Sequence, residues 1–318
     1  MSIAPKIFQP SSLCDIVDAI GDLDIPDGET AKAFALRHPP STSVLLIAQY
    51  RTLVQADWQF GLKGHNCNEH PLSVTQIQTG VVSVHPRGPL GVIVVYLKPE
   101  AAARILGAPL EEFADTKIDL RNILNIREVS LLEEMLAESR DSAERVAHVE
   151  AFLLRHMRRA EPESAASRAA MFLRRLPALS VWRLASKLDI SERHLSRSFQ
   201  AMFGTSPKRF ARIARVEKVL AARRGGSAWA DIAYACGFAD QAHMIRDFND
   251  IVGQSPRDFL RPASSGEKHT LAGASVMTYA VLGPVLTPLN DAAMRAIATP
   301  QYAVRRDLRP DLGSRHPG

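Results

Sequence analysis

The hydrophobic and polar positions of the chain follow a strand-like pattern in residues 41–97 and a helix-like pattern in the residues after them. Residues 41–97 carry short apolar runs and imperfect alternation of apolar and polar residues, in SVLLIAQYRTLVQADWQF, SVTQIQTGVVSVHP and GPLGVIVVYLKP. Runs of this length, rich in Val and Ile and bounded by Gly and Pro, are typical of strands. We therefore predict a small, mainly antiparallel sheet domain.

Beyond these strands the apolar positions recur at the spacing of a helix. The segment KPEAAARILGAPLEEF predicts a helix with Pro99 near its first turn, and Leu131 to Arg158 predicts one or two amphipathic helices. The charged, Pro-containing stretch RRAEPESAAS, at 158–167, predicts a domain boundary. From Ala169 to Arg261 the pattern is helical throughout.

One heptapeptide pattern occurs twice in the helical part, as GTSPKRF at Gly204–Phe210 and as GQSPRDF at Gly253–Phe259. Further matches precede both copies at the same offset of 49 residues, and they include His194 with His243, Arg197 with Arg246 and Phe199 with Phe248. Further back the offset becomes 48, because the second turn is one residue longer. The chain therefore contains one supersecondary unit twice.

Each unit has the layout of a helix-turn-helix motif. A short helix with a small residue, Ala185 or Ala233, precedes a turn, and a capping residue, Ser191 or Asp240, starts a second helix. One face of each second helix is apolar and is expected to pack against the domain. The opposite faces carry Arg193, Ser196, Arg197 and Gln200 in the first unit and Gln241, Ala242, His243, Ile245, Arg246 and Asn249 in the second. The Arg, Gln and His side chains among them are donors suited to bases and phosphates in a major groove.

Between the units, SPKRFARIARVEKVLAARRGG predicts one continuous helix that ends at Gly225-Gly226. A helix of about 17 residues is about 25 Å long, so it could hold the two units for successive major-groove turns, about 34 Å apart. Lys208, Arg209 and Arg257 lie beside the two Ser-Pro pairs. We expect these three to contact phosphates more than bases.

The charge is divided unevenly along the chain. Residues 1–164 hold 16 Lys and Arg against 22 Asp and Glu, a net charge of −6, whereas residues 165–262 hold 17 against 8, a net charge of +9. This asymmetry is typical of a nucleic-acid-binding domain joined to one that does not bind nucleic acid. A solvated basic face would carry the same charge, and Arg197 and Arg246 could instead form local salt bridges.

The part from Ala169 to Arg261 resembles the AraC/XylS family of bacterial transcription regulators, through LASKLDISERHLSRSFQAMFGTSPKRF and DIAYACGFADQAHMIRDFNDIVGQSPRDF. The resemblance implies a seven-helix domain that binds operator DNA and usually activates transcription through RNA polymerase. Trp229 and Ile245 depart from the family's pattern, and the second departure leaves the base preference open. Carried onto matching positions, the resemblance implies DNA contacts by Arg193, Ser196, Arg197, Gln241, Ala242, His243 and Arg246.

The front half also resembles the sensory region of such regulators, in GVIVVYLKPEAAARILGAPLEEFADTKIDL. That resemblance implies a β-rich ligand-binding barrel followed by dimerising helices. We therefore expect an α+β protein with an effector-binding and dimerisation domain at 1–160, an AraC-type DNA-binding domain with two helix-turn-helix units at 165–262, and a poorly ordered tail at 263–318. Its expected partners are double-stranded operator DNA, RNA polymerase and an unknown small-molecule effector, with a homodimer left open.

Little else in the chain points to chemistry. Cys14, Cys67 and Cys236 are scattered and odd in number, so we expect no disulfide framework and no four-cysteine zinc site, and a reducing cytosol fits best. The loop GHNCNEHP lacks the spacing of a metal site, and no cofactor or catalytic motif is expected. The uncharged stretch Leu271–Asn290 contains Ser, Thr, Gly and Pro and favours a tail over a membrane span.

Three function classes remain open on the sequence. The first is an effector-responsive transcription factor. The second is a DNA-binding module fused to an alkyl-transfer repair enzyme, against which the isolated cysteines argue, since that chemistry needs a reactive Cys and a zinc cluster. The third is an interaction scaffold whose basic domain binds DNA of any sequence. The sequence leaves activation or repression, the effector and the operator open.

Overall fold

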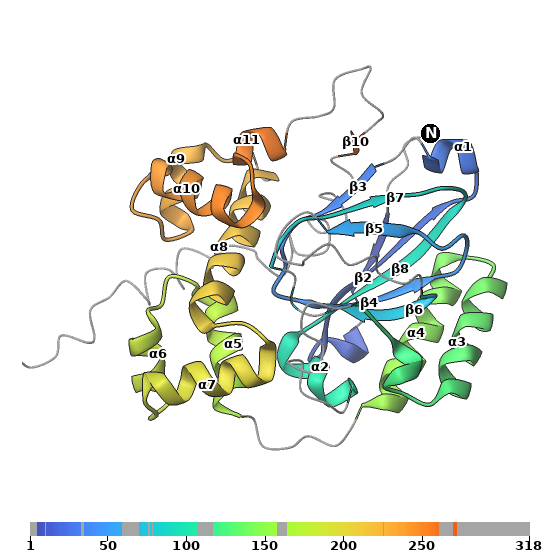
Figure 1. The fold of residues 1–318 in the computed structure, drawn as a ribbon, viewed down its shortest axis with the longest axis horizontal. Coiled ribbons are helices and arrows are strands. Elements are labelled where there is room, and N and C mark those ends of the chain that lie inside the picture. Colours follow the sequence, from blue (N-terminus) through green and yellow to red (C-terminus); the bar gives the residue numbers. More distant parts are fainter. Residues whose placement is uncertain are drawn as a thin grey trace, which may run out of the picture. The chain divides into compact units, whose positions relative to one another are not determined.

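The computed structural model describes residues 5–9, 11–32, 35–58, 70–75, 77, 79–106, 117–157, 164–224, 226–260 and 270–271 (Figure 1). The chain divides into two compact units, Met1–Thr287 and Pro288–Gly318, and every described residue lies in the first. The boundary expected between 160 and 165 falls inside that unit, so it stays a prediction. We call 5–157 the sheet domain and 164–260 the helical domain.

The sheet domain forms a six-stranded sheet and, together with β10 at Thr270–Leu271, a four-stranded sheet among the described residues. In the larger sheet every neighbouring pair is antiparallel, in the order β1 (Lys6–Phe8), β2 (Val17–Ile25), β8 (Leu90–Leu97), β4 (Val44–Gln49), β6 (Leu72–Thr75) and β9 (Lys117–Asp119). The smaller sheet has the order β10 (Thr270–Leu271), β3 (Ala35–His38), β7 (Val82–His85) and β5 (Gln55–Trp58), and only its β10–β3 pair is parallel.

The strand β8 lies at the centre of the larger sheet and explains why two apolar cores form. All eight of its residues are buried. Ile93, Val95 and Leu97 belong to the core cluster that continues into the helical domain, whereas the alternate residues Val92, Val94 and Tyr96 belong to a second cluster. Both faces of the strand are therefore covered, as its nearly continuous apolar sequence indicates.

The long strand β2 is a difference from the sequence analysis, which predicted no strand before residue 41. It pairs with both β1 and β8. Asp18, Asp22 and Asp24 interrupt its apolar pattern, but the first two are buried and all three accept hydrogen bonds from arginines far away in the sequence. The polar positions that hide this strand from sequence analysis are thus paired inside the fold.

Helices follow the strands as predicted. The helix α2 (Pro99–Leu106) begins at Pro99. The segment expected to form one or two helices forms two, α3 (Ile126–Glu138) and α4 (Ser142–His156), which lie side by side in Figure 1. Their caps, Asn125 and Asp141, accept hydrogen bonds from backbone N–H groups of the first turns. A short helix, α1 (Gly28–Lys32), and two 3-10 turns complete this domain as described.

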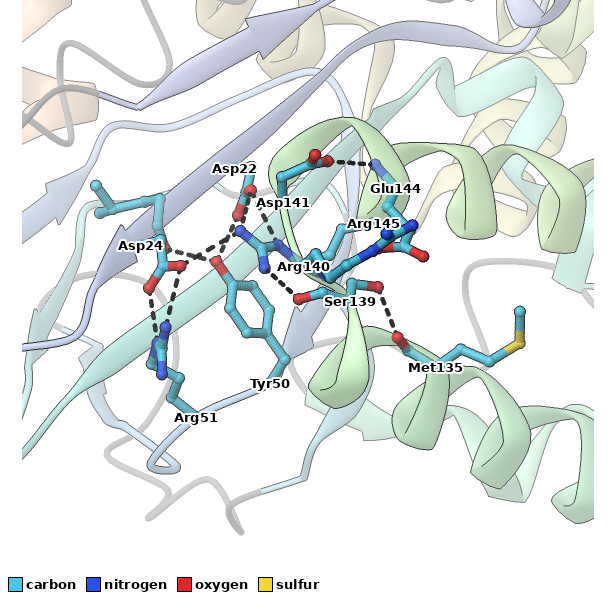
Figure 2. A network of polar contacts seen from close by, with 11 residues as sticks. Asp22, Asp24, Tyr50, Arg51, Met135, Ser139, Arg140, Asp141, Glu144 and Arg145 are labelled. Atoms are coloured by element: carbon cyan, nitrogen blue, oxygen red, sulfur yellow. Dashed lines mark hydrogen bonds and ion pairs between the residues drawn. The ribbon is translucent and has the colours of Figure 1, made fainter.

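Figure 2 shows a polar network that joins α4 to β2 of the larger sheet. The buried Arg145 guanidinium lies 3.1 Å from Asp22, 3.3 Å from Asp24 and 4.4 Å from the centre of the Tyr50 ring. The Tyr50 hydroxyl donates to Asp22 over 2.6 Å. Burial and the neighbouring Asp22 carboxylate raise the pKa of Tyr50 well above its ordinary value, so this hydroxyl stays a donor.

The helical domain contains only helices among its described residues: α5 (Ala165–Arg175), α6 (Val181–Lys187), α7 (Glu192–Phe203), α8 (Pro207–Arg224), α9 (Trp229–Ala235), α10 (Gln241–Val252) and α11 (Pro256–Phe259). The helix α8 connects the first unit, α6 and α7, with the second, α9 and α10 (Figure 1). The expected α+β fold is therefore confirmed, with sheets first and then two helix-turn-helix units joined by one helix.

The remaining expectations concern a membrane span, a metal site and the C-terminal tail. Within the described residues, no helix is long and apolar enough to cross a membrane, and no group of side chains could hold a metal ion. The loop GHNCNEHP with Cys67 lies outside the described residues except for His70 and the proline after it. The expected tail at 263–318, with the stretch Leu271–Asn290, also lies outside them except for Thr270 and Leu271.

Candidate nucleic-acid interface

The two second helices of the units, α7 and α10, begin and end in the same way. The Ser191 hydroxyl accepts a hydrogen bond from the His194 N–H over 3.1 Å, and the Asp240 carboxylate accepts one from the His243 N–H over 2.6 Å. Each helix ends at a glycine in the left-handed conformation, with φ of 67° at Gly204 and 81° at Gly253. These caps confirm the duplicated boundaries predicted from the sequence.

The turns between the helices also match, although their residues differ. The Ile190 N–H donates to the Ala185 carbonyl over 3.1 Å, and the Phe238 N–H donates to the Ala233 carbonyl over 2.9 Å. The residue before each donor has a positive φ, 57° at Asp189 and 76° at Gly237. The extra residue of the second turn is therefore Ala239, which lies between the shared turn and the cap of α10.

The apolar faces of α7 and α10 are buried as the repeat predicts. In α7, Met202 is partly buried, and the larger Phe203 takes the fully buried place next to it. Phe199, Phe203 and Phe210 form a cluster of rings whose centroids lie 4.7–6.2 Å apart. The buried set on the two helices is Leu195, Phe199, Phe203, Met244, Asp247, Phe248, Ile251 and Val252.

The opposite faces of α7 and α10 are open to solvent. Six of the seven expected DNA-contacting residues are exposed, namely Arg193, Ser196, Arg197, Gln241, Ala242 and Arg246. Within the described part of the chain, neither Arg197 nor Arg246 makes an ion pair, although they occupy matching positions. The alternative that these two arginines serve local salt bridges thus gains no support, and DNA contact stays a prediction for all seven.

His243 and Ile245 are placed differently from the others. His243 is half-buried, with its ring edge-on to Phe238 at 5.5 Å and its Nδ1 atom 3.5 Å from the Ala239 N–H. The side chain of Ile245 packs against the core. His243 thus contributes to the second turn whether or not it reaches DNA, and the apolar departure at Ile245 is explained by packing.

The connecting helix α8 is joined to α10 by ion pairs that the sequence analysis did not predict. Arg212 donates to Asp247 over 2.5 Å and to Asp250 over 2.9 Å, and Arg215 lies 3.4 Å from Asp247. The Arg215 guanidinium also lies 5.0 Å from the centre of the Phe238 ring. Two arginines that contribute to the basic charge of this domain therefore serve its internal structure.

The basic residues beside the Ser-Pro pairs lie in the first turns of α8 and α11. The Ser206 hydroxyl caps α8 by accepting from the Arg209 N–H over 3.2 Å, and Ser255 caps α11 by accepting from the Asp258 N–H over 3.1 Å. Lys208 and Arg257 are exposed. They are available to a phosphate at a helix N-terminus, as the sequence predicts.

Two exposed aromatic side chains were also missed by sequence analysis. Trp182 on α6 is 56% exposed and Tyr234 on α9 is 83% exposed. Apolar side chains that are scattered singly on a surface are ordinary, so neither one by itself indicates a binding role. The first helix of each unit presents an aromatic group, but at positions that do not match in the repeat, so the duplication gave no signal for them.

Of the two described cysteines, Cys236 does not have the setting of a reactive thiol. Burial raises the pKa of the Cys236 thiol to about 11, although Lys218 nearby lowers it in part. This thiol is therefore protonated at neutral pH and shielded from solvent. Cys14 is exposed, and its sulfur lies 4.0 Å from the Asp15 carboxylate.

Comparison with known protein families supports the presence of helix-turn-helix units in the helical domain. Residues 184–262 match the family model of a helix-turn-helix domain. No curated protein matches the chain in sequence. The matched stretch coincides with both units and their connecting helix, where the sequence resembles the AraC/XylS family.

Among solved structures, the chain is similar to an apo variant of ToxT from Vibrio cholerae strain SCE256, with a TM-score of 0.46, 11% identity and coverage of 76% of this chain and 96% of that one. A wild-type ToxT structure with bound unsaturated fatty acid gives 0.43, 11%, 76% and 94%. A DNA-binding transcriptional dual regulator from Escherichia coli K-12 gives 0.28, 20%, 32% and 94%. At these scores the likeness says nothing about which molecules this chain binds.

Proposed function

We propose that this chain is an AraC-type, sequence-specific transcriptional regulator that reads two successive major-groove segments. The match of residues 184–262 to the family model of a helix-turn-helix domain supports the proposal. The observation that carries the proposal is the pair of matching, exposed faces on α7 and α10, each with a guanidinium that has no ion pair among the described residues. A single helix-turn-helix would need a second copy of the protein to read two segments, whereas this chain carries both.

The side chains on these faces have the chemistry for distinct roles. Arg197 and Arg246 suit bidentate hydrogen bonds to guanine, Gln241 suits adenine, and the Ala242 methyl group suits the methyl group of thymine. Arg193 and Ser196 lie in the first half of α7, and His243 lies in the first half of α10. Each of these side chains can donate a hydrogen bond either to a phosphate or to a base edge.

The sheet domain is the part of the chain that we propose to bind a small-molecule effector. Its second apolar cluster is distinct from the core shared with the helical domain, although Ala221 of α8 packs against it. An effector could alter DNA binding only by unequal affinity for two arrangements of the protein. We place the regulator in the cytoplasm, with no catalytic role, with RNA polymerase as its protein partner and with the homodimer as an open arrangement.

The experiment for DNA reading starts from a 40-base-pair duplex that the full chain selects from a random-sequence pool. We expect Arg197→Ala with Arg246→Ala to weaken binding to this duplex by at least about 30-fold, because each base contact contributes about 1–3 kcal/mol. The matched control is Arg127→Ala with Arg155→Ala, two exposed arginines on α3 and α4, and it should change binding less than about twofold.

Two results would contradict the proposal. One is equal affinity of the wild-type chain for selected and random duplexes at physiological salt, which would indicate a basic domain that binds any DNA. The other is full binding by the double variant at α7 and α10. The effector part is tested separately, by thermal unfolding of the full chain across a metabolite library, and it fails if no compound raises the Tm.

A further inference from the structure

A cluster of buried polar side chains joins the sheet domain to the helical domain, and DNA reading makes no use of it. Glu217, in the middle of α8, is only 2% exposed, and Arg174 of α5 is 8% exposed. They meet Asp18 of β2 and Ser41 and Thr42, which precede β4, and these three are buried as well. Buried charges are costly unless they are paired, so this cluster needs an explanation.

The hydrogen bonds of the cluster cross from one domain to the other at Ser41, Thr42 and Asp18. The Glu217 carboxylate accepts from the Ser41 hydroxyl over 2.9 Å, from the Thr42 N–H over 2.8 Å and from the Thr42 hydroxyl over 2.7 Å. The Arg174 guanidinium donates to the Thr42 hydroxyl over 3.3 Å and also to the Asp18 carboxylate. Thr42 thus bonds to both charges that the helical domain brings to the cluster.

The charges in this cluster are not balanced. Three carboxyl groups, those of Asp18, Glu100 and Glu217, act electrostatically on the single guanidinium of Arg174, and Asp18 is bonded to it directly. Burial raises the pKa of Glu217 and of Glu100, although Arg174 lowers both in part. Asp18 Oδ1 and Glu100 Oε2 have no hydrogen-bond partner within the described residues. Such a contact has a small net stability, because the desolvation of buried charges offsets most of their attraction.

A second contact between the domains holds a residue that DNA binding would use. The Arg209 guanidinium donates to the Thr79 carbonyl of the sheet domain over 3.1 Å. Arg209 lies in the first turn of α8, directly after the end of α7, where the sequence predicts phosphate contact. Arg209 is exposed, and as long as the domains stay together one donor of its guanidinium is bonded to the sheet domain instead of being free for a phosphate.

Both contacts lie along one stripe of α8. Arg209 and Glu217 are eight residues apart and Ile213, halfway between them, is fully buried, so the three lie on one side of the helix. A different side of α8 carries Arg212 and Arg215, which hold α10. The helix that fixes the second recognition helix is therefore itself fixed to the sheet domain.

We propose that the Thr42–Glu217 and Asp18–Arg174 contacts form an autoinhibitory latch between the sheet domain and the DNA-binding domain. When the latch is closed, α8 and Arg209 are held on the sheet domain. When it opens, Arg209 is released to a phosphate and α8 is free to adjust both units to DNA. The inference rests on the proposed function, and it names the contact whose opening an effector would favour.

The first test is DNA affinity of full-length Thr42→Val, measured on the duplex selected by the wild-type chain. The substitution removes a hydroxyl that donates to Glu217 and accepts from Arg174. Hydrogen bonds to charged groups are strong enough that we expect about tenfold tighter DNA binding once this one is lost. Asp18→Asn, which removes the partner charge of Arg174 at nearly constant size, should shift affinity in the same direction.

The matched control is Thr75→Val. Thr75 is a buried threonine of β6 in the same domain, and its hydroxyl has no hydrogen-bond partner among the described residues. The same chemical change there should leave DNA affinity within about twofold of wild type. Equal or weaker DNA binding by Thr42→Val and by Asp18→Asn, in proteins that fold, would overturn the latch.

A second readout reports the latch without DNA. The Thr42 N–H is bonded to Glu217, so its exchange with solvent deuterium reports opening of the contact. We expect faster exchange in Asp18→Asn than in wild type, and unchanged exchange in Asp18→Asn would contradict the latch. If wild type binds selected DNA specifically and the variants gain nothing, only the latch fails. If neither the wild-type chain nor any variant distinguishes selected from random DNA, the proposed function fails, and the latch, as an inhibitor of specific DNA binding, fails with it.

Discussion

The two helix-turn-helix units have nearly the same local structure but different support. Both second helices have an oxygen cap, an exposed arginine and a left-handed glycine at their end. The first unit packs on α5, which in turn is bonded to the sheet domain through Arg174. The second unit is held by Arg212 and Arg215 of α8. The caps and terminal glycines are therefore the same in the two copies, whereas the residues that hold each copy in the fold are different.

The turns show the largest expected difference between the units. Gly237 has a φ of 76°, and a Cβ atom there would lie 2.7 Å from the Ala178 Cβ atom. We expect Gly237→Ala to lower the free energy of unfolding by about 2–4 kcal/mol, because backbone strain and overpacking add. At the matching position Asp189 already bears the positive φ, so Asp189→Gly should leave stability unchanged or raise it by up to about 1 kcal/mol. Urea unfolding of the full chain checks both, and equal losses would contradict the difference.

The ion pairs of α8 should matter to the second unit alone. Arg212→Ala leaves the buried Asp247 with Arg215 as its remaining cation, so we expect a loss of about 1–3 kcal/mol in the stability of α9 and α10. The buried Cys236 thiol, at the end of α9, reports this opening by its rate of reaction with a thiol reagent. The control Arg197→Ala removes an exposed arginine and should leave that rate unchanged, whereas equal rates in wild type and Arg212→Ala would rule out a specific role for the pair.

The caps should give equal and smaller effects. Ser191→Ala and Asp240→Ala each remove one hydrogen bond to a backbone N–H at a helix start, so each should cost about 1 kcal/mol. Thermal unfolding of the two single variants is the measurement. A cost several times larger in one unit would show that the two caps are not equivalent in spite of their shared geometry.

The buried carboxyl group of Glu217 predicts that the free energy of unfolding depends on pH. This dependence arises from α8 and not from the two helix-turn-helix units. The pKa of Glu217 in the folded chain is raised above the ordinary value of 4.5, mainly by burial. The folded state then binds more protons than the unfolded state, so the free energy of unfolding falls as the pH rises from 4.5 through the raised pKa. Arg174, Asp18 and Glu100 face the same site. Urea unfolding from acidic to neutral pH should give a flatter profile for Glu217→Gln, and a profile parallel to wild type would contradict this.

The helical half could be predicted from sequence because its signals are local. Ser191 and Asp240 as caps, Gly204 and Gly253 as ends and the Ser-Pro pairs as new starts all act within a few residues. Because these signals are duplicated, the register of α7 and α10 could be predicted from the sequence alone. The exposed faces with Arg197 and Arg246 follow from that register.

The rest depends on partners that are distant in the sequence. The strand β2 was missed because its aspartates look unfavourable until Arg145 and Arg174 are seen beside them, more than 120 positions away. The same holds for Glu217, which looks like one charge on a basic connecting helix until Ser41 and Thr42 bind it. Long-range pairing of this kind leaves no periodicity for sequence analysis to detect.

The central claim, that α7 and α10 read two separate groove segments, is tested most directly by hydroxyl-radical footprinting on the selected duplex. We predict that the wild-type chain protects two segments about one helical turn apart, near 10 base pairs. Arg197→Ala should weaken one of them and Arg246→Ala the other. A single protected segment, or loss of the same segment in both variants, would contradict the account.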